Sequence, residues 1–216
     1  MNSKTYQMFK SNNLSIYSSL IIWTFQVFGA VGILFWNKEW FIQFIPICLI
    51  LYFLILLKNN KNNNIFFLFI VFCWGMLSEI IGVNTGLIFG SYTYGNSLGI
   101  KLMNVPLLIG VNWFTTTAIC GTIANSMKVQ KFYKVLIAIF LMIFLDFFIE
   151  PVAPMIDMWS FSNSDVAPLS NYITWALVAL PLQIYYIMKK LEFNFTVSLN
   201  LYLSQLLFFV ILNFAK

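Results

Sequence analysis

Seven long apolar runs, separated by short polar segments, are the feature that most constrains this chain. They cover residues 15–36, 40–57, 65–83, 105–125, 135–150, 171–188 and 195–214. Each approaches the roughly 20 apolar residues that an α-helix needs to cross a bilayer. Helices and closed barrels are the folds that satisfy backbone hydrogen bonds in lipid, and these runs are too long for barrel strands. The sequence therefore predicts an all-α polytopic transmembrane bundle of about seven spans, with residues 1–216 forming one integral membrane domain.

The shortage of charge supports this prediction. Of the 216 residues, 61% are hydrophobic and 9% are charged, whereas about 25% are charged in an average soluble domain. Such a chain cannot cover a globule with a soluble surface, and it has no basic patch suited to nucleic acid. Cys48, Cys73 and Cys120 each lie within an apolar run, which favours small buried side chains over a disulfide framework or a metal site.

The lysines predict the orientation, because cytoplasmic loops of membrane proteins carry an excess of positive charge. With seven spans, nine lysines fall on the side of the N-terminus and three on the other side. The nine are Lys4, Lys10, Lys58, Lys61, Lys128, Lys131, Lys134, Lys189 and Lys190, and the three are Lys38, Lys101 and Lys216. We therefore expect a multi-pass protein of the cell (inner) membrane, with its N-terminus in the cytoplasm and its C-terminus outside.

The chain contains no histidine and no arginine. An AT-rich genome would also account for the absence of arginine. Iron or zinc sites built on imidazole are therefore excluded, as are Ser-His and Cys-His catalytic pairs. A retinal Schiff base is excluded too, because every lysine lies in a loop or at a terminus. The chemistry must come from other residues, and we expect neither a cofactor nor a metal.

Three acidic residues lie within or at the end of apolar runs, where ionisable groups are rare and indicate function. With the predicted orientation, Glu79, Asp146 and Glu150 all fall in the outer half of the bundle. Asp146 and Glu150 are four residues apart and share one helix face. Two such carboxyls resist joint ionisation, so we expect at least one to hold a proton near neutrality. The alternative is a structural role, in which these groups accept hydrogen bonds from neighbouring polar groups.

Several aromatic residues are expected near the same level. They are Tyr92, Tyr94, Trp113, Trp159, Phe161, Tyr172 and Trp175. Aromatic side chains commonly anchor membrane proteins at the interface. Beside a buried proton donor, they are also suited to stabilising a carbocation, because the faces of aromatic rings attract cations.

Two blocks of sequence resemble the carotenoid biosynthesis membrane-protein family, whose best-known members are carotenoid 1,2-hydratases (the CruF or bisanhydrobacterioruberin hydratase type). The first block is Glu79–Tyr94, followed by Leu98-Gly99, Pro106 and Trp113; the second is Asp146–Ala153, followed by Trp159, Pro168–Tyr172 and Trp175. Together they cover about residues 66–185, which we take as the family-like core.

The resemblance implies addition of water to the terminal 1,2 (1′,2′) double bond of an acyclic carotenoid within the bilayer, without a cofactor. Protonation of this alkene gives a tertiary cation, which water captures. Our hypothesis makes Asp146 or Glu150 the proton donor, and Glu79 the group that orients or deprotonates the water. The end group would be bound by Tyr92, Tyr94, Trp113, Trp159, Asn171 and Trp175. Other enzymes of carotenoid synthesis are candidate partners.

Three alternatives remain open at this point. A carotenoid or terpenoid cyclase begins with the same protonation, but an internal double bond captures the cation. A proton-coupled transporter would also contain carboxyl groups within the membrane. In a non-catalytic pigment-binding protein the carboxyl groups would be dispensable.

Overall fold

The computed structural model describes residues 3–60, 64–162, 164 and 166–215, and side chains from residue 13 onward. Within these residues, seven long α-helices make up most of the fold. They are α1 (Ser3–Phe35), α3 (Ile45–Lys58), α4 (Ile65–Thr85), α5 (Leu107–Asn125), α6 (Lys131–Ile149), α7 (Leu169–Met188) and α8 (Phe195–Phe214). Each predicted apolar run falls on a helix, so the predicted all-α polytopic bundle is confirmed.

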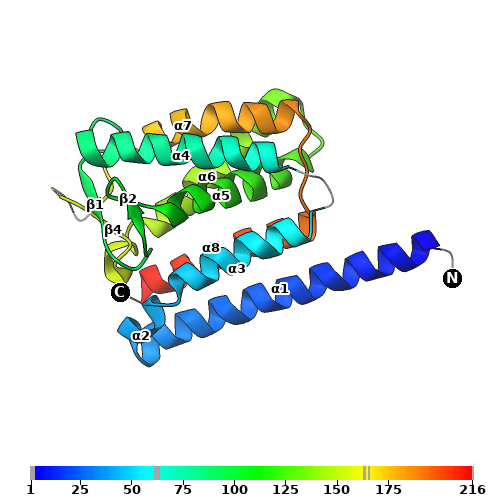
Figure 1. The fold of residues 1–216 in the computed structure, drawn as a ribbon, viewed down its shortest axis with the longest axis horizontal. Coiled ribbons are helices and arrows are strands. Elements are labelled where there is room, and N and C mark those ends of the chain that lie inside the picture. The colour runs from blue at the N-terminus through cyan, green and yellow to red at the C-terminus, as the bar shows by residue number, and fades with distance from the viewer. Residues whose placement is uncertain (1–2, 61–63, 163, 165, 216) are drawn as a thin grey trace.

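The long helices run back and forth along one direction (Figure 1). α1 begins at one end of the bundle and α8 finishes at the opposite end, as an odd number of crossings requires. Which end faces the cytoplasm stays a prediction, and two of the lysines on which it depends, Lys61 and Lys216, lie outside the described residues.

In the part of the chain that the structure describes, six segments are long and apolar enough to cross a membrane. One of them, Lys38–Lys58, consists of the short helix α2 (Lys38–Ile42) followed by α3. Pro46 lies in the first turn of α3, where its missing N–H is tolerated and the helix can start. Among the long helices described, α7 is not one of these six segments. It has the length of a span, but it contains Pro181 and the buried amides Asn171 and Gln183.

The central element is α5, which packs against α3, α4, α6, α7 and α8. Most of its side chains are buried on every side, as expected for a helix surrounded by others. Small residues allow this close packing, because a Cβ atom at Gly110 or Gly121 would lie under 3 Å from the rings of Phe72 or Tyr186. The outer helices expose large apolar side chains such as Phe28, Phe66 and Phe140, as lipid-facing helices do.

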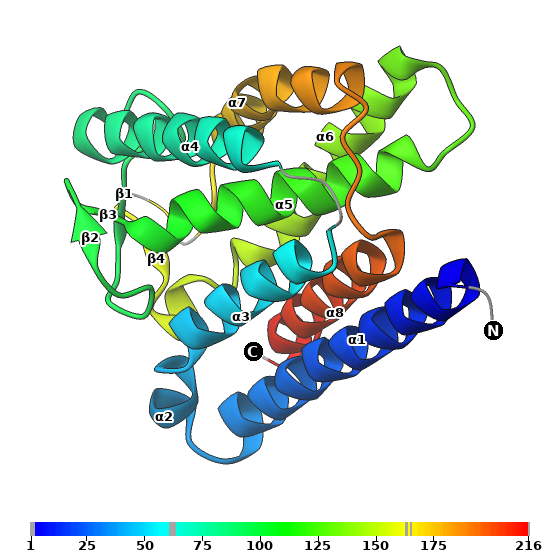
Figure 2. The same cartoon turned by 45° about the vertical axis from the view of Figure 1, so that its right-hand side comes forward.

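Short strands gather at the end of the bundle where α4 and α6 finish (Figures 1 and 2). β1 (Tyr92–Tyr94) pairs antiparallel with β4 (Trp159–Phe161), and β2 (Lys101–Leu102) pairs with β3 (Val105–Pro106). The chain leaves α4 through Gly86, whose φ of +70° is the left-handed conformation that ends many helices. The β1–β4 pair links the two long loops into one ordered layer over this end.

Candidate active site

The three buried carboxyl groups predicted from the sequence all lie toward the end of the bundle covered by the strands. Glu79 is less than two turns from the end of α4, Asp146 is in the last turn of α6, and Glu150 directly follows that helix. Their side chains are 3%, 2% and 6% exposed, respectively. They differ strongly in their hydrogen bonds, which distinguishes their chemistry.

Glu79 accepts three hydrogen bonds. The hydroxyls of Tyr92 and Tyr94 donate to Oε2 at 2.5 and 2.8 Å, and the indole Nε1 of Trp113 donates to Oε1 at 2.9 Å. The two tyrosines alternate along β1, so they lie on one face of the strand and reach the same oxygen. Burial and the neighbouring Glu79 raise the pKa of both phenols, which therefore stay protonated donors. Three donors on one carboxyl group favour its charged form.

Two glycines of α4 bring these donors close. A Cβ atom at Gly75 would lie 2.6 Å from Cγ of Trp113, so only glycine admits the indole there. Gly82 follows Glu79 by about one helical turn and lets the loop that carries Tyr92 pack closely against α4. A Cβ atom at Gly82 would lie 3.2 Å from the hydroxyl of Tyr92. The environment of Glu79 thus depends on small residues on both sides of it along α4.

Glu150 accepts two hydrogen bonds from segments that follow it in the chain. Nε1 of Trp159 donates to Oε2 at 2.9 Å, and Nδ2 of Asn171 donates to Oε1 at 2.8 Å. Pro151 helps α6 to end here, because proline has no backbone N–H with which to continue the helical hydrogen bonds. Burial raises the pKa of Glu150 to about 7, although both hydrogen bonds act in the opposite direction. Near neutral pH this carboxyl group can hold or release a proton.

Asp146 lies one turn before Glu150, whose backbone N–H donates to the Asp146 carbonyl at 2.9 Å. Both of its carboxyl oxygens are buried and have no hydrogen-bond partner among the described residues. The predicted catalytic role of Asp146 stays a prediction, because this residue does not line the cavity next to Glu79 and Glu150.

A small cavity of about 20 Å³ joins the remaining predicted residues. A water molecule needs about 10–15 Å³ and two to four polar partners, and here Glu79, Glu150, Asn112 and Asn171 supply polar groups. The wall contains all six residues predicted to bind the end group, namely Tyr92, Tyr94, Trp113, Trp159, Asn171 and Trp175. The cavity therefore has room for about one water molecule between two carboxyl groups.

The cavity walls are largely aromatic. Trp113 and Trp175 stack with ring centroids 4.1 Å apart, and Tyr94 contacts Trp159 edge to face at 6.0 Å. Phe161, expected near this level, also lines the cavity, and so do three residues that the sequence did not indicate, Phe89, Ile109 and Asn112. Asn112 had a usable signal, because it is an amide within an apolar run. In the described part of the chain, no group of three His, Cys, Asp or Glu side chains is arranged to hold a metal ion.

Comparison with known proteins gives one match. A family model described as carotenoid biosynthesis protein matches residues 38–216. The match is wider than the core predicted at residues 66–185, and it leaves α1 outside. No curated protein and no solved structure matches the chain.

Proposed function

Because the chain belongs to the carotenoid biosynthesis protein family, we propose that it is a cofactor-independent hydro-lyase, a carotenoid 1,2-hydratase. It would add water to the terminal 1,2 (1′,2′) double bond of an acyclic carotenoid. The observation that carries this proposal is a cavity the size of one water molecule, lined by two buried carboxyl groups with different hydrogen bonds. Hydration of an alkene requires an acid, a water molecule and a base in contact.

The hydrogen bonds suggest the role of each carboxyl group. Glu79 accepts three hydrogen bonds, which hold its two oxygens in place and suit it to orient the water and to take up the proton that the water loses. Burial raises the pKa of Glu150 to about 7, close to the operating pH, where general acids are most effective. Asp146 would act from behind Glu150 as a second proton-holding group.

The reaction balances with these residues alone. Glu150 transfers its proton to C2 of the terminal double bond, and the positive charge develops at the tertiary carbon C1. Water attacks C1, forming the C–O bond, and Glu79 takes the proton that the water loses. The proton then returns from Glu79 to Glu150 through the shared cavity, which restores the starting state. The product is a tertiary alcohol.

The aromatic wall would stabilise the cation. Rings attract a positive charge within about 6 Å of their centroids, with an energy of about 2 kcal/mol or more when the site is dry. The stacked pair of Trp113 and Trp175 and the phenols of Tyr92 and Tyr94 surround the cavity. These rings also exclude bulk water, so that the single positioned water captures the cation.

The substrate must open the site, because a branched end group is larger than a cavity of about 20 Å³. The side chains most suited to move are Trp159 and Phe161 on β4, which are only half-buried. The long polyene would extend into the bilayer, whose hydrocarbon core of about 30 Å is similar to the length of a carotenoid. We also propose that the protein resides in the cell (inner) membrane with a cytoplasmic N-terminus, as the lysine distribution predicts.

A cyclase is the second candidate, because it shares the first protonation. Room for one water between Glu79 and Glu150 favours hydration, since a cyclase must keep water away from the cation. A proton-coupled transporter is less well supported. The buried carboxyl groups of the described residues lie toward one end of the bundle, whereas transport requires access from both sides.

The test is expression in a bacterium that makes lycopene, followed by mass analysis of the pigments. The wild type should produce lycopene plus one or two water molecules, and Glu79→Gln and Glu150→Gln should abolish this product. Glu39→Gln is the matched control, because Glu39 is an exposed acid of α2. Unchanged pigment from well-expressed wild type, across several acyclic carotenoids, would contradict the proposal.

A further inference from the structure

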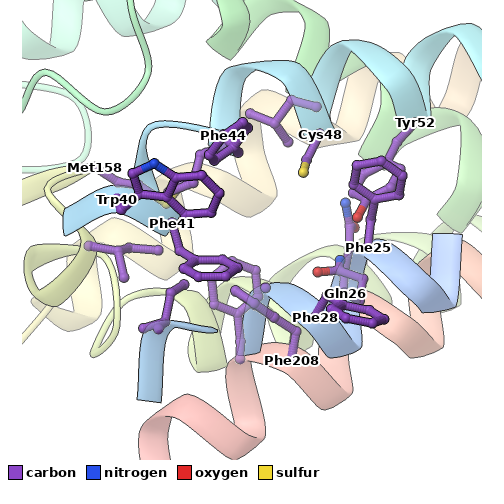
Figure 3. A pocket seen from close by; sticks show the side chains of 17 residues that line it. Phe25, Gln26, Phe28, Trp40, Phe41, Phe44, Cys48, Tyr52, Met158 and Phe208 are labelled. Atoms are coloured by element: carbon purple, nitrogen blue, oxygen red, sulfur yellow. The ribbon is translucent and has the colours of Figure 1, made fainter. Parts of the chain in front are cut away.

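A second and much larger cavity lies between α1, α2, α3 and α8, with a volume of about 260 Å³. Most of its wall is apolar. The rings of Trp40, Phe41 and Phe44 lie on one side of it, away from Gln26 and Tyr52 (Figure 3). Its volume is slightly below the range of about 300–1,000 Å³ for pockets that enclose a drug-sized ligand. It therefore suits one end of a long molecule better than a whole carotenoid.

Three polar side chains in this wall have unused hydrogen-bonding capacity. Gln26, Tyr52 and Gln205 are 9%, 3% and 6% exposed. The Tyr52 hydroxyl has no partner among the described residues, and the side chains of Gln26 and Gln205 form no hydrogen bond to any of them. A buried polar group without a partner is destabilising by about 1–3 kcal/mol. One such hydroxyl, on Tyr52, beside the amides of Gln26 and Gln205 in the same cavity wall indicates a ligand that carries a hydrogen-bonding group.

The depth of these groups narrows the chemistry of that ligand. Gln26 and Gln205 each lie nine residues before the last residue of α1 and α8, respectively, a distance of about 14 Å along the helix. In a hydrocarbon core of about 30 Å this is close to the middle of the bilayer. Phospholipid tails carry no polar group at this depth, because their ester groups lie near the surface. An isoprenoid chain that ends in a hydroxyl group would carry one.

We propose that this cavity binds the hydroxylated end group of a carotenoid, the alcohol formed at the carboxyl site. This inference rests on the proposed function and adds to it a second subsite, for the product. The hydroxyl group would be bound by Gln26, Tyr52 and Gln205, and the methyl-branched chain would contact the aromatic side.

The two cavities share one segment of the chain. Ile156 and Met158 line the large cavity, and the next residue, Trp159, donates to Glu150 in the small one. This segment separates the site where the alcohol forms from the site that binds it. Gln26 belongs to α1, which lies outside the residues that match the family model. The polar end of the subsite therefore includes a helix added to the matched region.

The experiment measures binding without turnover, in the full chain carrying Glu150→Gln. This protein, in detergent, is mixed with equal amounts of lycopene and a 1-hydroxylated lycopene, and the pigments retained after gel filtration are extracted and quantified. We expect about tenfold more alcohol than hydrocarbon to be retained, since hydrogen bonds are worth about 0.5–1.5 kcal/mol each. Adding Gln26→Leu, Tyr52→Phe and Gln205→Leu should reduce this ratio to about one while leaving lycopene retention unchanged.

Gln43→Leu is the matched control, because Gln43 is exposed and lies outside the cavity; it should keep the preference. Equal retention of both pigments by the Glu150→Gln protein, or a preference that persists when Gln26, Tyr52 and Gln205 are all replaced, would overturn the subsite. Unchanged lycopene retention in the variant with these three replacements shows that the protein is still folded. A wild type that makes no hydrated lycopene but keeps the preference would refute the proposed function and still support the subsite.

Discussion

The substitution Gly75→Ala tests whether the position of Trp113 controls Glu79. The added Cβ atom would lie 2.6–2.8 Å from three atoms of the Trp113 side chain, whereas carbon atoms in good contact are about 3.5–4.0 Å apart. The indole must therefore move by about 1 Å, and its stacking on Trp175 at 4.1 Å limits where it can go. We expect its hydrogen bond to Glu79, 2.9 Å long in the wild type, to be lost.

The size of the effect follows from that bond. Hydrogen bonds to charged groups contribute about 1.5–3 kcal/mol, which corresponds to a rate loss of about 10- to 150-fold. Overpacking should also lower the free energy of unfolding by about 1–3 kcal/mol. The assay is the initial rate of hydrated lycopene formation by membranes that contain equal amounts of each variant. Leu77→Ala is the control on the same helix, because Leu77 is exposed and its replacement should leave the rate unchanged.

A double substitution separates this cause from general damage. Trp113→Phe removes the same donor without touching α4, so it should lose about as much rate as Gly75→Ala. The combined variant should be little slower than either single one, because both act through one hydrogen bond. Wild-type rates for Gly75→Ala, or losses that multiply in the combined variant, would refute this reasoning.

Five further predictions concern single groups of the site. The hydration rate should fall as pH rises through about 7, because Glu150, whose pKa burial raises to about 7, then loses the proton it donates; a pH–rate profile without this decline would contradict its role. Because the pKa of Glu150 is higher in the folded protein than in the unfolded chain, Glu150 stabilises the folded protein at pH values below the ordinary pKa of glutamate. This contribution to the free energy of unfolding is lost as pH rises through about 7, and chemical unfolding at several pH values would measure it. Trp159→Phe removes a hydrogen bond that favours the charged form of Glu150, so the decline in rate should move to higher pH. Tyr94→Phe should slow hydration about tenfold, because it removes a hydrogen bond to Glu79. Asp146→Asn should slow hydration less than tenfold, whereas Glu150→Gln should slow it at least about 100-fold. Equal losses in Asp146→Asn and Glu150→Gln would show that Asp146 takes part directly.

The helices and the three carboxyl groups were predictable because they depend on local patterns. Apolar runs of span length predicted the bundle, and the spacing of Asp146 and Glu150 put them on one helix face. The apolar run predicted at 135–150 ends next to Pro151, and α6 finishes at Ile149. The short helix α2 was less predictable, because the break at Pro46 interrupts a run whose composition is continuous.

The partners of the carboxyl groups could not be predicted, because they come from distant parts of the chain. Tyr92 and Tyr94 reach Glu79 through a strand that pairs with residues far along the sequence. Helical spacing likewise could not indicate that Glu150 lines the cavity while Asp146 does not. The large cavity depends on α1 packing against α8, the first and last helices, and no local pattern predicts that contact.

The most direct test of the proposed chemistry traces the oxygen of the product. Membranes that contain the wild-type protein would be incubated with lycopene in water enriched in oxygen-18, and the pigments analysed by mass. Hydration predicts a tertiary alcohol that carries the heavy oxygen, formed equally well without air and not formed by Glu79→Gln or Glu150→Gln. An alcohol without the label, or an isomer with the mass of lycopene, would contradict it.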